Sequence, residues 1–309
     1  MQSLTVGIAT WNRAHLLRGT LDQLLASSVP AGVSREIVVV DNNSNDETPL
    51  ILESYREKYG IVPLHESRQG KSHALNRIIK VASGDYMLWI DDDIRVEKDW
   101  MVHYYDAFVR WPDAAVFGGT ITPSFLETPP NWILEGMDEI GGVFGLCQPS
   151  PGPFVFGDSP LPFGGNMAVR MDVQRKFAFD ERMGRKGGQL LTGEEADLVS
   201  RILQHNHKGS WVPEARVRHV IPPRMQTLSY VRRYFHDFGA SLALMRLQEM
   251  PKSRKVPPPL WVWRDALHQE VLYRFGRMLG RPVQSWIRNL RLAAFAQGSL
   301  IRRPMRVDL

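Results

Sequence analysis

The chain has 309 residues, of which 43% are hydrophobic and 23% are charged, as is ordinary for a soluble globular protein. A chain of this length buries roughly three quarters of its unfolded surface, and we expect one large domain or about two smaller ones. The single cysteine excludes an internal disulfide and a metal site of several thiolates, and it favours a reducing, cytoplasmic setting. Neither a membrane span nor a signal peptide is expected from the pattern of apolar residues.

Strands and helices alternate through the first 110 residues. Short apolar runs predict strands, and apolar residues at helical spacing predict the helices between them. Continuous β-branched runs are typical of strands covered on both faces, so the fold class is α/β with a mostly parallel sheet. The predicted strands are 4–9, 36–41 and 85–91, and the predicted helices are 15–27, 46–60 and 71–83.

The rest of the chain changes in composition. A further helix is predicted over 193–206, and "PKSRKVPPPL" is proline-rich, basic and without periodicity, as expected of a linker. Residues 261–309 carry a net charge of +6, which leaves −1 for the other 260 residues. The expected organisation is a domain of residues 1–250 (halves 1–110 and 111–250), a linker at 251–260, and a basic extension of amphipathic helices at 261–309.

Three aspartates, Asp91, Asp92 and Asp93, directly follow the third predicted strand. Ligands of α/β sheets bind outside the carboxyl ends of strands, and Asp41 ends the second predicted strand in the same way. Asp91 and Asp93 would point the same way from an extended backbone and offer two hard oxygen ligands to Mg²⁺ or Mn²⁺. The alternative is a solvated turn.

Other phosphate and metal sites fit less well. An EF-hand loop starting at Asp41 fails because Asp46 and Leu52 stand where Gly and Glu are required, and no P-loop motif occurs. A phosphohydrolase of the haloacid-dehalogenase type remains a rival, although its aspartate pair is expected on the first strand, and Arg95 stands where Thr or Val would follow.

An ordered set of motifs over about residues 4–220 resembles the inverting family 2 glycosyltransferases, whose fold is called GT-A. The segments "VGIATWNR", "IVVVDNNSND", "RQGKSHALNRII", "WIDDDI", "GGNMAVR" and "GEEADL" follow one another in the family's order. Departures are Asn42–Asn43 for Asp-Gly, Arg68 for Asn, and Glu195 for Asp. The resemblance implies a GT-A domain that transfers a sugar from a nucleotide diphosphate sugar, most directly a UDP-sugar.

The resemblance also implies roles for individual residues. Asp41 would accept a hydrogen bond from the base, Thr10 would line the base pocket, and Lys71 with Arg68 would meet the diphosphate. Alternatives are a turn cap for Asp41 and exposed charges for Lys71 and Arg68. The implied nucleotide-sugar-binding residues are Thr10, Asn12, Arg13, Asp41, Arg68, Lys71, Asp91, Asp92, Gly165 and Asn166.

The resemblance implies a divalent cation, Mn²⁺ or Mg²⁺, held by Asp93, Asp91 and His219, and a catalytic base at Glu195. Because Glu replaces the family's Asp there, Glu194 and Asp197 remain candidates for the base. Each of the three would also suit the first turn of a helix, where the helix dipole favours carboxylates. A catalytically inactive domain that binds nucleotide sugar or glycan is the alternative to an enzyme.

The basic extension has two interpretations. Aromatic residues interleaved with arginines are typical of a segment lying on an anionic membrane, which would place the protein at the inner face of the membrane. Alternatively, its apolar stripe packs on the catalytic domain or on a second subunit. No nucleic-acid recognition motif is present, and the lack of Q-x-x-R-W and of membrane helices predicts one sugar per event, transferred to a saccharide or a lipid-linked saccharide.

Overall fold

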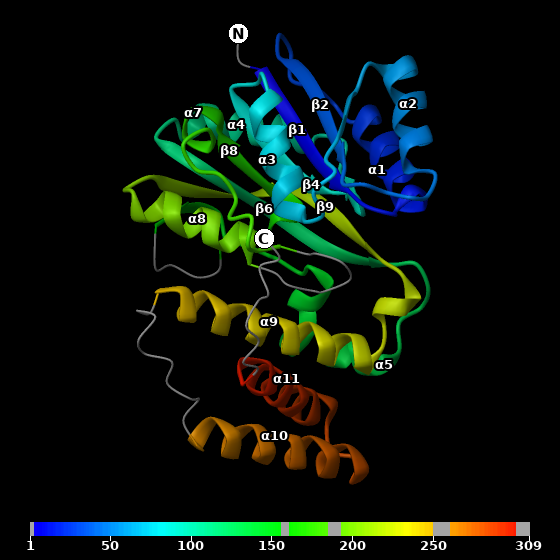
Figure 1. Cartoon of the computed structure of the whole chain (residues 1–309), viewed down its shortest axis with the longest axis vertical. Coiled ribbons are helices and arrows are strands. Elements are labelled where there is room, and N and C mark those ends of the chain that lie inside the picture. The colour runs from blue at the N-terminus through cyan, green and yellow to red at the C-terminus, as the bar shows by residue number, and fades with distance from the viewer. Residues whose placement is uncertain (1–2, 156–160, 185–192, 250–259, 301–309) are drawn as a thin grey trace. The chain divides into compact units, whose positions relative to one another are not determined.

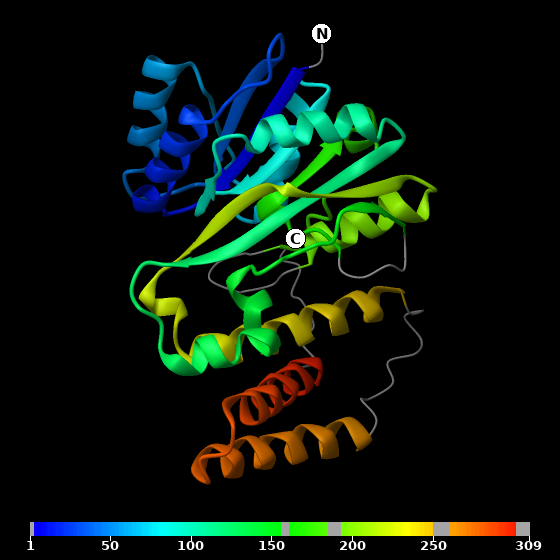
Figure 2. The same ribbon diagram turned by 180° about the vertical axis from the view of Figure 1, so that it is seen from behind.

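A computed structural model of the chain describes residues 3–155, 161–184, 193–249 and 260–300 (Figures 1 and 2). The predicted linker lies outside the described residues, apart from Leu260, which begins a helix. The chain divides into two compact units. The first comprises 1–126, 144–187 and 194–221, and the second comprises 127–143, 188–193 and 222–309. The second unit thus includes more of the chain than the basic extension alone.

The first half of the large unit is a parallel α/β arrangement, as the alternation of elements predicts. Buried apolar runs form the strands, and helix α2 ends at Gly60, whose positive φ of 69° suits glycine. The elements are β1 (Ser3–Thr10), α1 (Ala14–Ala26), β2 (Ser34–Asp41), α2 (Thr48–Tyr59), β3 (Val62–His65), α3 (Lys71–Val81), β4 (Tyr86–Asp91), β5 (Ile94–Val96) and α4 (Trp100–Arg110).

The second half of this unit completes the sheet. Its 14-residue strand β9 pairs with β6 and β7 of the second half and with β5 of the first half. The two halves therefore share one sheet. The elements are β6 (Ala114–Phe125), β7 (Gly152–Phe154), the short 3₁₀ turn η2 (Gly164–Asn166), β8 (Met167–Arg170), α7 (Met171–Gln174), α8 (Glu194–Gln204) and β9 (Lys208–Ile221).

Within the described residues the sheet holds nine strands in the order β3-β2-β1-β4-β8-β6-β9-β5, with β7 beside β9. The pairs β2–β3, β1–β2 and β1–β4 are parallel, whereas β8 is antiparallel to both neighbours. Helices α3 and α4 cover opposite faces of the sheet: α3 lies in front of the sheet in Figure 1, and α4 lies in front of it in Figure 2, which is viewed from behind. The expected α/β sheet flanked by helices is therefore confirmed, with a mixed second half.

The second unit is helical. Helix α11 packs against both α9 and α10, and Arg288 and Arg291 of α11 form ion pairs with Glu139. No helix among the described residues is long and apolar enough to span a bilayer. The elements are α5 (Asn131–Glu135), α6 (Met137–Ile140), η1 (Gly141–Phe144, whose last residue belongs to the first unit), η3 (Pro223–Met225), α9 (Leu228–Glu249), α10 (Leu260–Met278) and α11 (Val283–Ser299).

Candidate active site

Three parallel strands end at one edge of the sheet and place acidic residues there. Thr10 of β1 is in register with Asp41 of β2, and Ala9 is in register with Asp91 of β4. The carboxyl ends of β1, β2 and β4 therefore lie side by side, where α/β sheets bind ligands. This arrangement brings Asp41 and the three consecutive aspartates to the same edge of the sheet.

The aspartates after β4 do not form a solvated turn, because Asp92 is only 5% exposed and Asp93 only 3%. Arg13 donates through Nη1 to Oδ1 of Asp92 at 2.8 Å and to Oδ2 of Asp93 at 2.6 Å. Thr10 donates its hydroxyl to Oδ2 of Asp92 at 2.8 Å. Burial raises the pKa of Asp92, and the two carboxylates raise the pKa of Arg13. Arg13 and Thr10 thus hold the turn from within.

The backbone is not extended through the three aspartates, since β4 ends at Asp91 and a turn follows. Asp91 and Asp93 consequently meet different partners. The antiparallel pairing of β5 with β9 puts Ile94 opposite His219, and Nε2 of His219 lies 3.4 Å from Oδ2 of Asp93. The turn therefore delivers Asp93 to His219, whereas Asp91 pairs with Lys71.

His219 is oriented by a backbone carbonyl. Its Nδ1 lies 2.9 Å from the carbonyl oxygen of Phe144. Because a carbonyl oxygen only accepts, Nδ1 carries the proton and Nε2 faces Asp93. Burial lowers the pKa of His219, but the attraction of Asp93 outweighs it, so that the pKa is raised. A ring held in this way is the arrangement found in metal-binding histidines, whose second nitrogen donates to a carbonyl or carboxylate.

Lys71 links the aspartates to the acidic start of α8. Its Nζ lies 2.9 Å from Oδ1 of Asp91, 2.7 Å from Oε1 of Glu195 and 3.3 Å from Oε1 of Glu194. Burial would lower the pKa of Lys71, but the three carboxylates raise it well above its usual value. Since Lys71 is the first residue of α3 and Glu195 belongs to α8, the cluster joins two helices on one face of the sheet (Figure 1).

The two glutamates of this cluster differ in protonation. Burial raises the pKa of Glu194 to about 8, because its side chain is enclosed and Glu195 lies beside it. Burial also acts on Glu195, but Lys71 lowers its pKa below the usual value. The cluster therefore favours the protonated form of Glu194 and the ionised form of Glu195. Asp197 instead pairs with Arg201 at 2.8 Å along α8.

The loop after β2 is fixed by its own hydrogen bonds. Asp41 accepts from the backbone N–H of Ser44 at 2.9 Å through Oδ1, and its Oδ2 lies 3.8 Å from Nδ1 of His65. Asn12, with a positive φ of 52°, accepts from the N–H of Asn45 at 2.8 Å. Arg68 is half-exposed and pairs with Glu66 at 3.0 Å.

Asn166 is wholly buried, with every polar group of its side chain in use. Its Oδ1 accepts from Trp100 and Tyr104, and its Nδ2 donates to the carbonyls of Thr120 and Ala215, at distances of 2.7–2.9 Å. This side chain therefore ties η2 to α4, β6 and β9 and is not open to a ligand. Its position supports the neighbouring glycines.

The glycines of η2 allow close approach to the cluster. A methyl group on Gly165 would lie 3.5 Å from Oδ2 of Asp91, and one on Gly164 would collide with the carboxylate of Glu195. Gly165 was predicted as a site residue from the sequence motif, whereas Gly164 was not. Only the packing of η2 against α8 reveals the second glycine.

A divalent cation would find two suitable donors here, the carboxylate of Asp93 and the Nε2 atom of His219 that faces it. Among the described residues, no three His, Cys, Asp or Glu side chains are grouped closely enough to hold a metal alone. The donor set therefore fits a cation that takes its other ligands from a diphosphate and from water, as Mg²⁺ commonly does.

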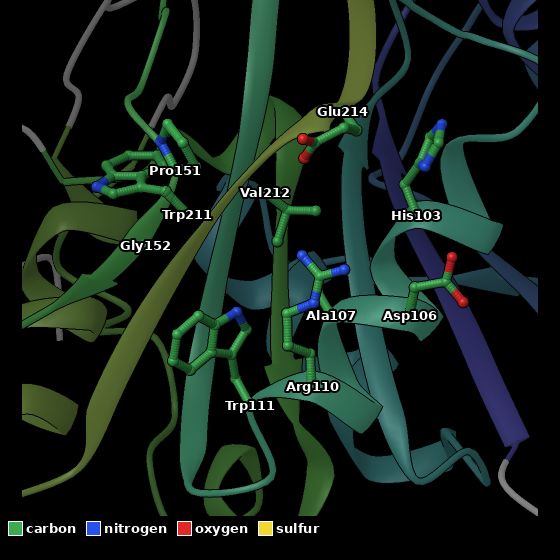
Figure 3. Close-up of a pocket in the computed structure, with 10 residues that line it drawn as sticks. All are labelled: His103, Asp106, Ala107, Arg110, Trp111, Pro151, Gly152, Trp211, Val212 and Glu214. Atoms are coloured by element: carbon green, nitrogen blue, oxygen red, sulfur yellow. The ribbon is translucent and has the colours of Figure 1, made fainter.

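A cavity of about 330 Å³ lies elsewhere in the first unit (Figure 3). Trp211 and Val212 of β9 line it and pair with Gly118 and Gly119 of β6, whereas His219 pairs with Pro123, four to five residues or roughly 13–17 Å further along β6. It is thus separate from the acidic cluster. Its lining residues are His103, Asp106, Ala107, Arg110, Trp111, Pro151, Gly152, Trp211, Val212 and Glu214.

Comparison with known proteins identifies the family. Residues 5–175, more than half of the chain, match the family described as Glycosyl transferase family 2. This chain belongs to that family. It is 26% identical over 227 residues to the glucosyl-dolichyl phosphate glucuronosyltransferase of Haloferax volcanii, covering 70% of this chain and 68% of the relative. The glycosyltransferase prediction is therefore confirmed, and the phosphohydrolase alternative is set aside.

Solved structures agree in fold. A mannosyltransferase from Pyrobaculum calidifontis, in complex with GDP-Man and Mn²⁺, aligns with a TM-score of 0.63 and 18% identity, covering 96% of this chain and 86% of that chain. Residues 1–349 of TarS from S. aureus in complex with UDP align with a TM-score of 0.54 and 17% identity, covering 97% and 90%. These similarities confirm the GT-A fold expected from the sequence.

Proposed function

We propose that this glycosyltransferase is a metal-dependent, inverting enzyme that moves one sugar from a nucleotide diphosphate sugar, most directly a UDP-sugar, to a hydroxyl of a saccharide or a lipid-linked saccharide. The observation that carries the proposal is the contact of Lys71 with both Asp91 and Glu195, at 2.9 and 2.7 Å. It joins the end of β4, where a diphosphate would bind, to an ionised carboxylate on α8.

Glu195 is the base in this proposal. Its carboxylate would take the proton from the acceptor hydroxyl while that oxygen attacks the anomeric carbon and the bond to the diphosphate breaks. Glu194 suits this role less well, because its pKa of about 8 keeps it protonated at neutral pH. Asp197 suits it less well because its carboxylate is paired with Arg201.

Lys71 would serve the leaving diphosphate. When phosphate oxygens enter the site, they attract Lys71 away from Glu195, and the pKa of Glu195 then rises toward its ordinary value. A carboxylate becomes a stronger base as its pKa rises toward the working pH. In this proposal the donor itself prepares the base, so that the proton is taken chiefly after the donor has bound.

Asp93 and His219 would hold the divalent cation, with Asp91 close enough to act directly or through water once Lys71 turns to the phosphates. When bound, such a cation supplies Lewis-acid stabilisation of the departing diphosphate. Arg13 and Thr10 keep the turn in place from behind and are positioning residues. The proposed cation is Mn²⁺ or Mg²⁺.

Asp41 would accept the ring N–H of the base with Oδ2, since Oδ1 already accepts from Ser44. A uracil ring offers such an N–H, which is the basis for preferring UDP. The solved structures of similar fold contain GDP-Man in one case and UDP in another. A lipid-linked acceptor is favoured by the relative from Haloferax volcanii, named for action on glucosyl-dolichyl phosphate. The proposed location is the cytoplasm, at the inner face of the membrane when the acceptor is lipid-linked.

The experiment compares calorimetric binding of UDP, GDP and dTDP, each with and without Mn²⁺, in wild type, Asp93→Asn and Glu195→Gln. We expect metal-dependent binding of one nucleotide, lost in Asp93→Asn and retained in Glu195→Gln. Release of that nucleotide from its sugar conjugates, with saccharide acceptors present, should fall on the order of 10²- to 10⁴-fold in Glu195→Gln.

Asp197→Asn is the matched variant, because it removes a carboxylate from the same helix outside the cluster. A larger loss of turnover in Asp197→Asn than in Glu195→Gln would overturn the assignment of the base. Nucleotide binding without turnover of any donor would favour a binding protein instead, and equal binding with and without metal would refute the metal site.

A further inference from the structure

Helix α10 is apolar on two opposite faces, and only one of them is covered by the residues that the structure describes. Ala266, Tyr273 and Gly276 are buried, and the ring of Tyr273 lies near that of Trp286 on α11, with 6.2 Å between the centroids. The opposite face leaves large apolar side chains 36% to 86% exposed. We call this face the α10 apolar surface, formed by Leu260, Trp261, Trp263, Leu267, Val271, Leu272, Phe275 and Met278, with Leu279 just after the helix.

The exposure follows from helical spacing. At about 100° per residue, Leu260, Leu267, Val271 and Met278 fall within roughly 40° of one another, opposite the buried Tyr273. Figure 1 shows α11 between α9 and α10, so that within this unit α11 covers the inner side of α10 only. A continuous apolar surface of this kind on a folded protein marks a place of contact with a partner or a lipid.

The charges among these apolar residues are of one sign. The ionisable residues on the same half of α10 are Arg264, His268 and Arg274. Of the helix's two acidic residues, Glu270 is mostly buried and pairs with Arg232 and Arg274, and Asp265 lies at the border of the surface. The surface therefore offers apolar side chains with basic groups interleaved, which complements a layer with an apolar interior and an anionic boundary.

We propose that the α10 apolar surface docks on an anionic lipid membrane, with α10 lying in the plane of the interface. Trp261 and Trp263 at its first turn suit the boundary, where an amphipathic ring has one apolar and one wet side. A second copy of this chain fits less well. A twofold contact between two such surfaces would bury Arg264 of both copies in one apolar contact, where like charges oppose each other.

The biological purpose of this docking rests on the proposed function, in which the acceptor is lipid-linked. Docking itself needs no catalysis. Docking would hold the enzyme on the surface where a lipid-linked acceptor resides. A tethered enzyme meets such an acceptor at a higher effective concentration without any new contact in the active site.

The test is flotation of the full chain with vesicles of phosphatidylcholine alone or mixed with phosphatidylglycerol, at low and high salt. Leu267→Glu with Phe275→Glu changes two exposed residues of the surface, 67% and 55% exposed. Leu50→Glu with Val109→Glu is the matched control, because these residues are 74% and 62% exposed on helices of the other unit.

We expect wild type and the control to bind the anionic vesicles, and the α10 double variant to bind at least tenfold more weakly. Arg264→Gln should weaken binding about fivefold, and high salt should weaken that of wild type. Unchanged binding in the α10 double variant, or an equal loss in the control, would refute the proposal. Failure of wild type to float with any vesicle would also refute the proposal. If wild type is then a dimer in light scattering and the α10 double variant is a monomer, the surface binds a second copy instead.

Nucleotide binding by calorimetry on the same preparations separates the two proposals. Intact nucleotide binding without flotation refutes membrane docking alone. Flotation without nucleotide binding refutes the proposed donor site and leaves the docking surface standing. Circular dichroism of each variant shows whether its helices are retained.

Discussion

The protonated state of Glu194 leads to a pH dependence of stability that a single substitution should remove. Glu194 is enclosed beside Glu195, and burial raises its pKa from 4.5 to about 8. A carboxyl whose pKa is raised on folding stabilises the folded state fully below its unfolded pKa. That contribution is lost as the pH rises through the folded pKa. Glu194→Gln keeps the shape of the side chain and cannot ionise, so this variant should not show the loss.

The size of the effect follows from the shift. Each pH unit between the unfolded pKa of 4.5 and the folded pKa of about 8 removes about 1.36 kcal/mol at most, which sets an upper limit on the order of a few kcal/mol. Lys71 lies 3.3 Å from Glu194 and can move toward the new charge. The difference in free energy of unfolding between Glu194→Gln and wild type should therefore grow by about 2–5 kcal/mol from pH 5 to pH 9.

The assay is urea denaturation followed by tryptophan fluorescence at pH 5, 6, 7, 8 and 9 for both proteins. Wild type should lose stability relative to Glu194→Gln steadily from pH 5 to pH 8, with little further change between pH 8 and pH 9. Glu47→Gln on the surface is the control and should follow wild type at every pH. If wild type and Glu194→Gln differ by a constant amount across the range, Glu194 does not change its protonation on folding in this way, and the reasoning about the two glutamates is wrong.

Three further substitutions test the structure around the site. Arg13→Met removes the guanidinium group that pairs with the buried Asp92 and Asp93, and it should lower the free energy of unfolding by about 3–5 kcal/mol in urea denaturation. The control, Arg18→Met on the exposed side of α1, should change the free energy of unfolding by less than about 0.5 kcal/mol. Asn166→Ala removes four buried hydrogen bonds and should cost about 3 kcal/mol or more, so a loss under about 1 kcal/mol would contradict its structural role. Gly164→Ala should displace the candidate base and reduce donor turnover at least tenfold with nucleotide affinity unchanged in calorimetry; a parallel loss of affinity would mean that η2 shapes the nucleotide site instead.

Local sequence determined three strands and four helices of the first unit and the position of its acidic residues, whereas β3, β5–β9 and α4 were not predicted. Apolar runs ending in Asp41 and Asp91 became β2 and β4, and "GEEADL" became the first turn of α8, because burial of apolar faces and helix-end preferences act over a few residues. The strand β3 at Val62–His65 was not predicted, since four residues with a proline give no clear alternation.

Partners of the charged residues were decided by tertiary structure alone. Lys71 meets Glu195, 124 residues away, and His219 meets Asp93 only because β5 and β9 pair in one particular register. Neither spacing nor composition carries such a register, which depends on the packing of the whole sheet. Likewise, Asp92 and Asp93 look alike in sequence, yet only Asp93 faces His219.

The same distinction holds for the basic extension. Its sequence determined that the extension forms helices, which are α10 and α11, and that apolar residues recur around α10. Which of its apolar faces is covered was decided by the packing of α10 on α11, because a helix that is apolar on both sides can bury either one. A periodic pattern records that a face is apolar, but only the fold determines what that face meets.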